Sequence, residues 1–171
     1  HLSGTDRIYE ALNTFDQNRK IEKVINLQGD LPTIDKFALK EVLNLLDNTE
    51  VDIGTLVAPF KDFDEMQKAQ YVKAECHFKS NNIKARAANF TRIPDKENTE
   101  NLYHHIGIYS YRREALEKFV NLKQTDREKE EKLEQLRAIE NNMHIEVSLI
   151  NSPIQGIDTQ EDLDNIREIQ K

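Results

Sequence analysis

Cysteine is almost absent from this sequence, and the scarcity limits its covalent chemistry. The 171 residues contain one cysteine, Cys76, so no disulfide can form within the chain. A lone cysteine weakly favours a reducing compartment, and in the stretch YVKAECHF it is expected to be a small buried strand residue rather than a nucleophile. Adjacent strand residues point to opposite faces, so His77 is not expected to activate it.

Long apolar runs are missing as well. No stretch approaches the length needed to cross a bilayer, and the first residues show no charged head followed by an apolar run, the pattern of a secretory leader. We therefore expect a cytoplasmic protein with no membrane partner. The length fits a single domain, residues 1–171, with one substantial core.

The chain also lacks a basic excess. It carries 24 Lys and Arg against 31 Asp and Glu, a net charge of -7, which repels polyanions unless a basic face is segregated. Its lysines in the first half are dispersed among acidic and apolar residues, which predicts a solvated surface and no nucleic-acid partner. These lysines are Lys61, Lys68, Lys73, Lys79 and Lys84.

What the sequence does contain is an alternation of helical and strand-like hydrophobic patterns, which predicts an α/β fold. Turn-forming residues 80–82 predict an antiparallel hairpin, and Ser3 and Thr159 are expected to cap helices. Helices are expected at 6–15, 34–48, 113–122, 126–141 and 159–170, and strands at 23–28, 51–59, 69–78, 82–90, 104–112 and 144–150.

Polar residues follow three of the predicted strands. Asp30 follows VINLQG, Arg92 follows ARAANFT, and Asp158 follows SLINSPIQGI. In open α/β sheets ligands bind outside the carboxyl ends of strands, so these residues are candidates for one site. Each is equally compatible with a helix cap or a turn.

Five segments, in this order and spacing, resemble the 3-deoxy-manno-octulosonate cytidylyltransferases, or CMP-KDO synthetases. The resemblance runs over essentially the whole chain, and the second, third and fifth segments are the most specific. The segments are SGTDR (3–7), NLQGDLP (26–32), HIGIYSYRREALEKFV (105–120), LEQLRAIE (133–140) and GIDTQEDLDNIR (156–167).

The resemblance implies a glycosyltransferase-A-like nucleotidyltransferase fold with a mixed sheet. It implies an enzyme that joins CTP to the acid sugar 3-deoxy-D-manno-octulosonate (KDO), giving CMP-KDO and pyrophosphate for lipopolysaccharide biosynthesis in a Gram-negative bacterium. In-line attack on the α-phosphorus requires neutralised phosphate charge, and Mg²⁺ held by carboxylates would supply it. Magnesium is therefore the expected cofactor.

The matching motifs also imply roles for individual residues. Asp30 and Asp158 match the metal-binding carboxylates, and Arg92 matches an arginine near the acid sugar, so these three are the expected catalytic residues. Ser3, Gly4 and Asp30 are implied at the nucleotide. Gln28, Arg92, His105, Tyr109, Glu134 and Gln135 are implied at KDO.

Other interpretations of these residues stay open. His105 and Tyr109 lie four apart on a strand and so share a face, where they would serve equally as a core histidine and a core aromatic. Glu134 would serve as a surface charge. Family members are commonly homodimers, so a homodimer is expected; Leu133, Leu136 and Ile139 have the helical spacing of an interface, although such residues more often form core.

The sequence departs from the family pattern at its beginning and at Leu31. No basic, glycine-containing loop that would cradle the triphosphate precedes SGTDR, so the chain is expected to lack the N-terminal phosphate-loop unit. Leu31 stands where an acidic residue usually follows QGD. One alternative is therefore an inactive fragment or remnant that keeps the sugar-binding and dimerisation surfaces. A second, disfavoured one is a related enzyme for another acid sugar, such as a sialic acid.

Overall fold

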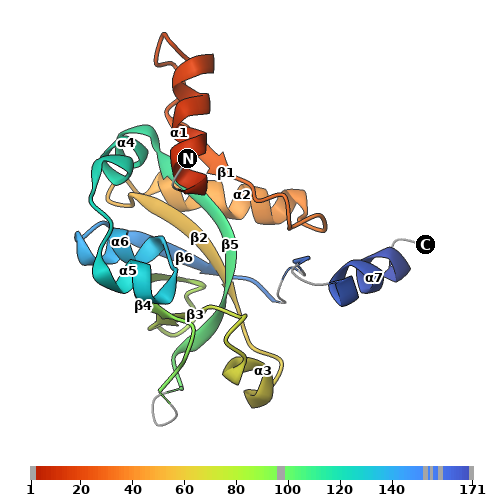
Figure 1. Ribbon diagram of the computed structural model, residues 1–171. Coiled ribbons are helices and arrows are strands. Elements are labelled where there is room, and N and C mark those ends of the chain that lie inside the picture. Colours follow the sequence, from red (N-terminus) through yellow and green to blue (C-terminus); the bar gives the residue numbers. More distant parts are fainter. Residues whose placement is uncertain (1–2, 96–98, 152–153, 155, 158–159, 170–171) are drawn as a thin grey trace.

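A computed structural model describes residues 3–95, 99–151, 154, 156–157 and 160–169 of the chain. Helices and strands alternate as the hydrophobic pattern predicts (Figure 1). The helices are α1 (Gly4–Phe15), α2 (Lys36–Asn44), η1 (Leu45–Asp47), α3 (Phe63–Gln67), α4 (Arg113–Asn121), α5 (Asp126–Glu131), α6 (Gln135–Glu140) and α7 (Gln160–Ile169). The strands are β1 (Lys23–Asn26), β2 (Ile53–Ala58), β3 (Lys73–Cys76), β4 (Lys84–Thr91), β5 (Leu102–Arg112) and β6 (Ile145–Leu149).

The strands form one mixed sheet in the order β1-β5-β2-β6-β4-β3, and β3 also pairs with β5. Among the described pairings β2 and β6 are parallel and the others are antiparallel, including the β3–β4 hairpin. The predicted α/β fold with a mixed sheet is thereby confirmed. Because β3 returns to β5, five of the six strands close into a ring, and β1 extends from it.

Helices bury both faces of the central strand β2, which explains its continuous apolar sequence. Ile53 and Val57 belong to a core cluster that includes residues of α1, α4 and α6. Leu56 and Ala58 face the other way and pack in a second cluster with residues of α2. The side chains of β2 thus alternate between two cores, as the period of a strand requires.

Two helix starts follow from side-chain caps. Ser3 Oγ accepts a hydrogen bond from the backbone N–H of Asp6 at 3.1 Å, which confirms Ser3 as the N-cap of α1. Asp35 caps α2 by accepting from two backbone N–H groups. Thr159, the expected cap of the last helix, lies outside the described residues.

The single helix expected over 126–141 is wrong, because the segment is broken into α5 and α6. Lys132 between them is left-handed, at φ 54° and ψ 46°. Thr125 and Glu128 form a capping box at the start of α5, and Glu128 also binds the buried Arg137 of α6 with both carboxylate oxygens. A charge-rich sequence of good helix formers does not reveal this buried ion pair, which connects α5 to α6 across the break.

Burial settles several expectations. Cys76 is fully buried, as predicted for a strand residue, and His77 is exposed. Leu133 and Leu136 are core residues that are at most 4% exposed, so they do not form an exposed stripe. None of the helices in the described part of the chain combines the length and apolar character that a membrane span needs.

Candidate active site

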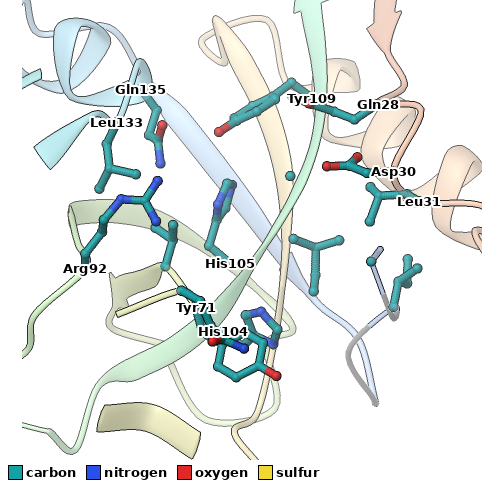
Figure 2. Close-up of a pocket in the computed structure, with 16 residues that line it drawn as sticks. Gln28, Asp30, Leu31, Tyr71, Arg92, His104, His105, Tyr109, Leu133 and Gln135 are labelled. Carbon is teal, nitrogen blue, oxygen red and sulfur yellow. The ribbon is translucent and has the colours of Figure 1, made fainter. Parts of the chain in front are cut away.

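A pocket of about 290 Å³ lies where two strands separate along one edge of β5. β1 pairs with residues 109–112 of β5, and β3 pairs with residues 102–104 on the same edge, since β2 occupies the other. Between them the N–H of His105 donates to the carbonyl of Val72, and Ile106 and Gly107 line the pocket. Figure 2 shows the pocket, and its lining includes Gln28, Asp30, Leu31, Tyr71, Arg92, His104, His105, Tyr109, Leu133 and Gln135.

An irregularity in β5 shapes the floor of this pocket. Thr55 of β2 lies opposite Tyr109, but the next residue, Leu56, lies opposite Ile106, so β5 has two extra residues there. Two extra residues preserve the alternation of faces. His105 and Tyr109 accordingly share a face, with ring centroids 5.4 Å apart, as their spacing predicts.

His105 lines the pocket as an uncharged, closely packed side chain. The side chain is 7% exposed, and its ring packs edge-on against Phe90 with centroids 5.1 Å apart. Burial, with a smaller contribution from the neighbouring His104, lowers the pKa of His105 to about 3. The ring is therefore neutral at physiological pH and can offer one donor and one acceptor.

Tyr109 is held neutral in the same way. Burial raises the pKa of its phenol well above the usual value, and the charges of Tyr111 and Glu134 add to the shift. A neutral phenol both donates and accepts hydrogen bonds, which suits a polyhydroxylated ligand.

Arg92 lines the pocket, but much of its hydrogen-bonding capacity is used by the protein. Nε donates to the carbonyl of Glu131 at 2.9 Å, and the two Nη atoms donate to the carbonyls of Ala69 and Lys132 at 3.3 and 3.5 Å. Three of the five N–H donors are thus directed at described backbone groups, and two are left for an anionic ligand.

Lys73 contacts the backbone of Arg92, and the prediction that Lys73 lies on a solvated surface is wrong. The side chain is fully buried, and its ammonium donates to the carbonyls of Lys68, Tyr71 and Arg92 at 2.7, 2.8 and 2.7 Å. Burial lowers the pKa of Lys73, and the charge of Arg92 lowers it further. Dispersed lysines in a sequence do not show which one turns inward to satisfy loop carbonyls.

Asp30 and Gln28 enter the pocket from the segment after β1, and Figure 2 shows Asp30 across the strand from Arg92. The carbonyl of Asp30 accepts a hydrogen bond from the N–H of Ile157 at 2.8 Å, so the chain returns to Asp30 immediately before position 158. Asp158 itself lies outside the described residues. Among the described residues no cluster of three metal-binding side chains occurs, and Asp30 is the acidic residue of the described pocket lining.

The structure distinguishes between the remaining candidates. Gln135 lines the pocket and is 7% exposed, whereas Glu134 lies outside the lining, with its Oε1 4.0 Å from Arg137 Nη2. Ser3 and Gly4 also lie outside the lining. Ser3 is engaged with Asp6, as both acceptor and donor.

Sequence reasoning missed two aromatic residues of the lining. His104 stacks on Phe60 with centroids 5.4 Å apart, and Tyr71 packs against it edge-on at 4.9 Å. Burial lowers the pKa of His104. The doubled histidine before IGIY was the one available signal, because Tyr71 comes from an irregular segment with no motif.

Comparisons with known proteins show which family the sequence matches. A cytidylyltransferase family model matches residues 1–145. The 3-deoxy-manno-octulosonate cytidylyltransferase of Bartonella bacilliformis is 47% identical over 169 residues, which are 99% of this chain and 69% of that protein. The enzyme of the same name from Brucella canis is 45% identical over 98% of this chain and 66% of its own length.

Solved structures extend the likeness to the fold. A CMP:2-keto-3-deoxy-manno-octonic acid synthetase complexed with CTP superposes with a TM-score of 0.84 at 27% identity, over 99% of this chain and 68% of that one. A UDP-glucose pyrophosphorylase reaches 0.62 at 14% identity, over 96% of this chain and 62% of its own, which is a likeness of fold alone.

Proposed function

The chain belongs to the 3-deoxy-manno-octulosonate cytidylyltransferase family, and from this membership we propose that it transfers the cytidylyl group of CTP to KDO, releasing pyrophosphate. The observation that carries the proposal is the arrangement of one pocket. Motif residues from four separate segments line it together, namely Gln28 and Asp30, Arg92, His105 and Tyr109, and Gln135.

Neutral and charged groups occupy different sides of the pocket. His105, Tyr109 and Gln135 form a neutral wall of donors and acceptors that suits sugar hydroxyls. Arg92 supplies the cation for a carboxylate, and Asp30 on the opposite side supplies an anionic oxygen for a metal. Holding a sugar hydroxyl in line with the α-phosphorus requires such fixed groups on both sides.

We propose Mg²⁺ as the cofactor, held by Asp30 with Asp158 as the second carboxylate of the motif. The metal would neutralise phosphate charge as pyrophosphate leaves. The oxygen donor of Asp30 fits this ion, and Ile157 bonded to the Asp30 carbonyl brings the chain to the same point. A cytoplasmic location, a Gram-negative source, a place in lipopolysaccharide assembly and a homodimeric state belong to the same proposal.

The direct test is pyrophosphate release, given CTP, KDO and Mg²⁺, by the 171-residue chain and by the same chain extended upstream by a phosphate-loop unit. Release that depends on both substrates and the metal is expected where the phosphate-loop unit is present. A folded chain that binds both substrates and releases nothing would contradict the proposal and favour the inactive-remnant alternative.

The metal assignment predicts a large effect of Asp30→Asn, which removes the anionic oxygen but keeps the shape. Turnover should fall on the order of 10²-fold or more, with little change in stability. Asp35→Asn is the matched control, because Asp35 caps α2 outside the pocket lining and asparagine is an equally good cap. Equal rates in the two variants would refute the role of Asp30.

A further inference from the structure

A single hydroxyl group lies beneath the sugar-facing wall of the pocket. Thr55 is fully buried at the irregularity of β5, and its Oγ1 lies 3.1 Å from the carbonyl oxygen of Ile106 and 2.7 Å from that of Ile108. The same oxygen lies 3.0 Å from Nε2 of His105. One hydroxyl group therefore lies within hydrogen-bond distance of three polar atoms.

Counting protons determines the direction of these hydrogen bonds. Thr55 has one hydroxyl proton, and the two carbonyl oxygens can only accept. The proton must point toward them, most directly to the carbonyl oxygen of Ile108. In the opposite orientation the lone pairs of the hydroxyl oxygen would face those of the two carbonyl oxygens, and these would repel. Oγ1 is then an acceptor toward His105, so the proton of the neutral ring resides on Nε2.

The other ring nitrogen is the one available to a ligand. Among the described residues Nδ1 of His105 has no hydrogen-bond partner, and the residue lines the pocket. Phe90 and Tyr109 both pack against the ring, with centroids 5.1 and 5.4 Å away, which hinders a rotation that would exchange its nitrogens. With the proton fixed on Nε2, Nδ1 carries a lone pair.

We propose that Thr55 is a positioning residue that locks His105 in its Nε2–H tautomer, so that Nδ1 accepts a hydrogen bond from a hydroxyl group of the sugar substrate. The inference rests on the proposed function for the identity of that sugar. The lone pair of Nδ1 repels a carboxylate, so the acid group of KDO is directed elsewhere in the pocket. The charged N–H groups of Arg92 are the donors that suit it.

The tautomer is measurable in the free protein by two-dimensional ¹H–¹⁵N NMR of histidine-labelled chain, with His105 assigned from a His105→Gln sample. Wild type should show a pyridine-type Nδ1 and a protonated Nε2. Thr55→Val, which keeps the side-chain shape and removes the hydroxyl, should lose this preference, and Thr55→Ser should keep it. A wild-type His105 protonated on Nδ1 would overturn the proposal.

Ser148→Ala is the matched control for loss of a buried hydroxyl. Ser148 is fully buried on β6 beside β2, bonds to Glu41, and is not part of the pocket lining. The variant should leave the His105 signals unchanged. A change as large as that in Thr55→Val would show that the tautomer responds to general loosening of the sheet, and would overturn the specific role of Thr55.

Titration with KDO tests the second half of the proposal. The Nδ1 signal should move on binding, and Thr55→Val should weaken the affinity about tenfold, while Thr55→Ser stays within about threefold of wild type. If, in a uniformly ¹⁵N-labelled sample, signals of Arg92 and Gln135 respond to KDO but Nδ1 does not, the acceptor role is overturned and the proposed function stands. If KDO binds nowhere, the proposed substrate fails, and the tautomer result stands separately.

Discussion

Burial, more than charge, decides what each residue of the pocket offers to a ligand. His105 and Tyr109 are both held neutral by desolvation, so one wall presents dipoles without net charge. Among the described lining residues, charge is confined to the carboxylate of Asp30 and the guanidinium of Arg92. A sugar acid needs such a division, because its hydroxyl groups and its carboxylate require different partners.

The low pKa of His105 predicts a pH-dependent loss of stability. Below the ordinary value of 6.5 the unfolded chain takes up a proton at this site, whereas the folded chain does so only near pH 3. Stability is therefore fully present above 6.5 and is lost as the pH falls toward 3, by about 3 kcal/mol at a pH of about 4.

Urea unfolding of wild type and His105→Gln across this range isolates the effect, since both chains share the titration of their carboxylates. The free energy of unfolding should fall more steeply with decreasing pH in the wild type than in His105→Gln. The exposed His77 gives the control, and His77→Gln should keep the wild-type slope. Parallel curves for wild type and His105→Gln would contradict a buried neutral His105.

Cys76 should be chemically inert in the folded protein. It is fully buried, and burial raises the pKa of its thiol to about 12. Because the thiolate is the reactive form, a thiol reagent such as DTNB should modify the native chain only as fast as the chain opens, and should modify the urea-unfolded chain at once. Rapid reaction in the absence of denaturant would show that this strand is not packed as described.

At the scale of elements, the site depends on β5 and on the break between α5 and α6. β5 pairs with β1, β2 and β3, and the two extra residues of its irregularity keep His105 and Tyr109 on one face. The break after α5 matters because the carbonyls of Glu131 and Lys132 orient Arg92. Both features are departures from regular structure, and neither was predicted from the sequence.

The left-handed conformation of Lys132 predicts an unusual order of stabilities. Glycine adopts this conformation without a Cβ penalty, so the free energy of unfolding of Lys132→Gly should equal that of wild type or exceed it by up to about 1 kcal/mol. Lys132→Val should lose more than about 1 kcal/mol, because a β-branched residue fits poorly there. Denaturant midpoints measure the order; a valine variant more stable than the glycine variant would indicate a continuous helix through this position.

For the whole molecule, the sequence predicted the order of elements and the composition of the pocket better than its internal geometry. Hydrophobic period identifies strands and helices locally, and motif resemblance placed Asp30, His105 and Gln135 in one site. Thr55 and Lys73 could not be found in this way, since a buried hydroxyl and a buried ammonium acquire their roles only from carbonyls brought to them by distant segments. Glu134 shows the converse, a motif residue that lies outside the lining.

Assembly of the pocket from several separate segments predicts that sugar binding stabilises the entire chain. The lining comes from the end of β1, the approach to β3, the end of β4, β5 and α6, so a bound ligand joins segments that must separate on unfolding. At a KDO concentration of about 100 times its Kd, the free energy of unfolding should rise by about 2.7 kcal/mol, which raises Tm by roughly 5–11 °C. Differential scanning calorimetry measures the shift, and a polyol without a carboxylate, such as sorbitol, at the same concentration controls for solvent effects. An equal shift with sorbitol would mean that KDO is not held by this pocket.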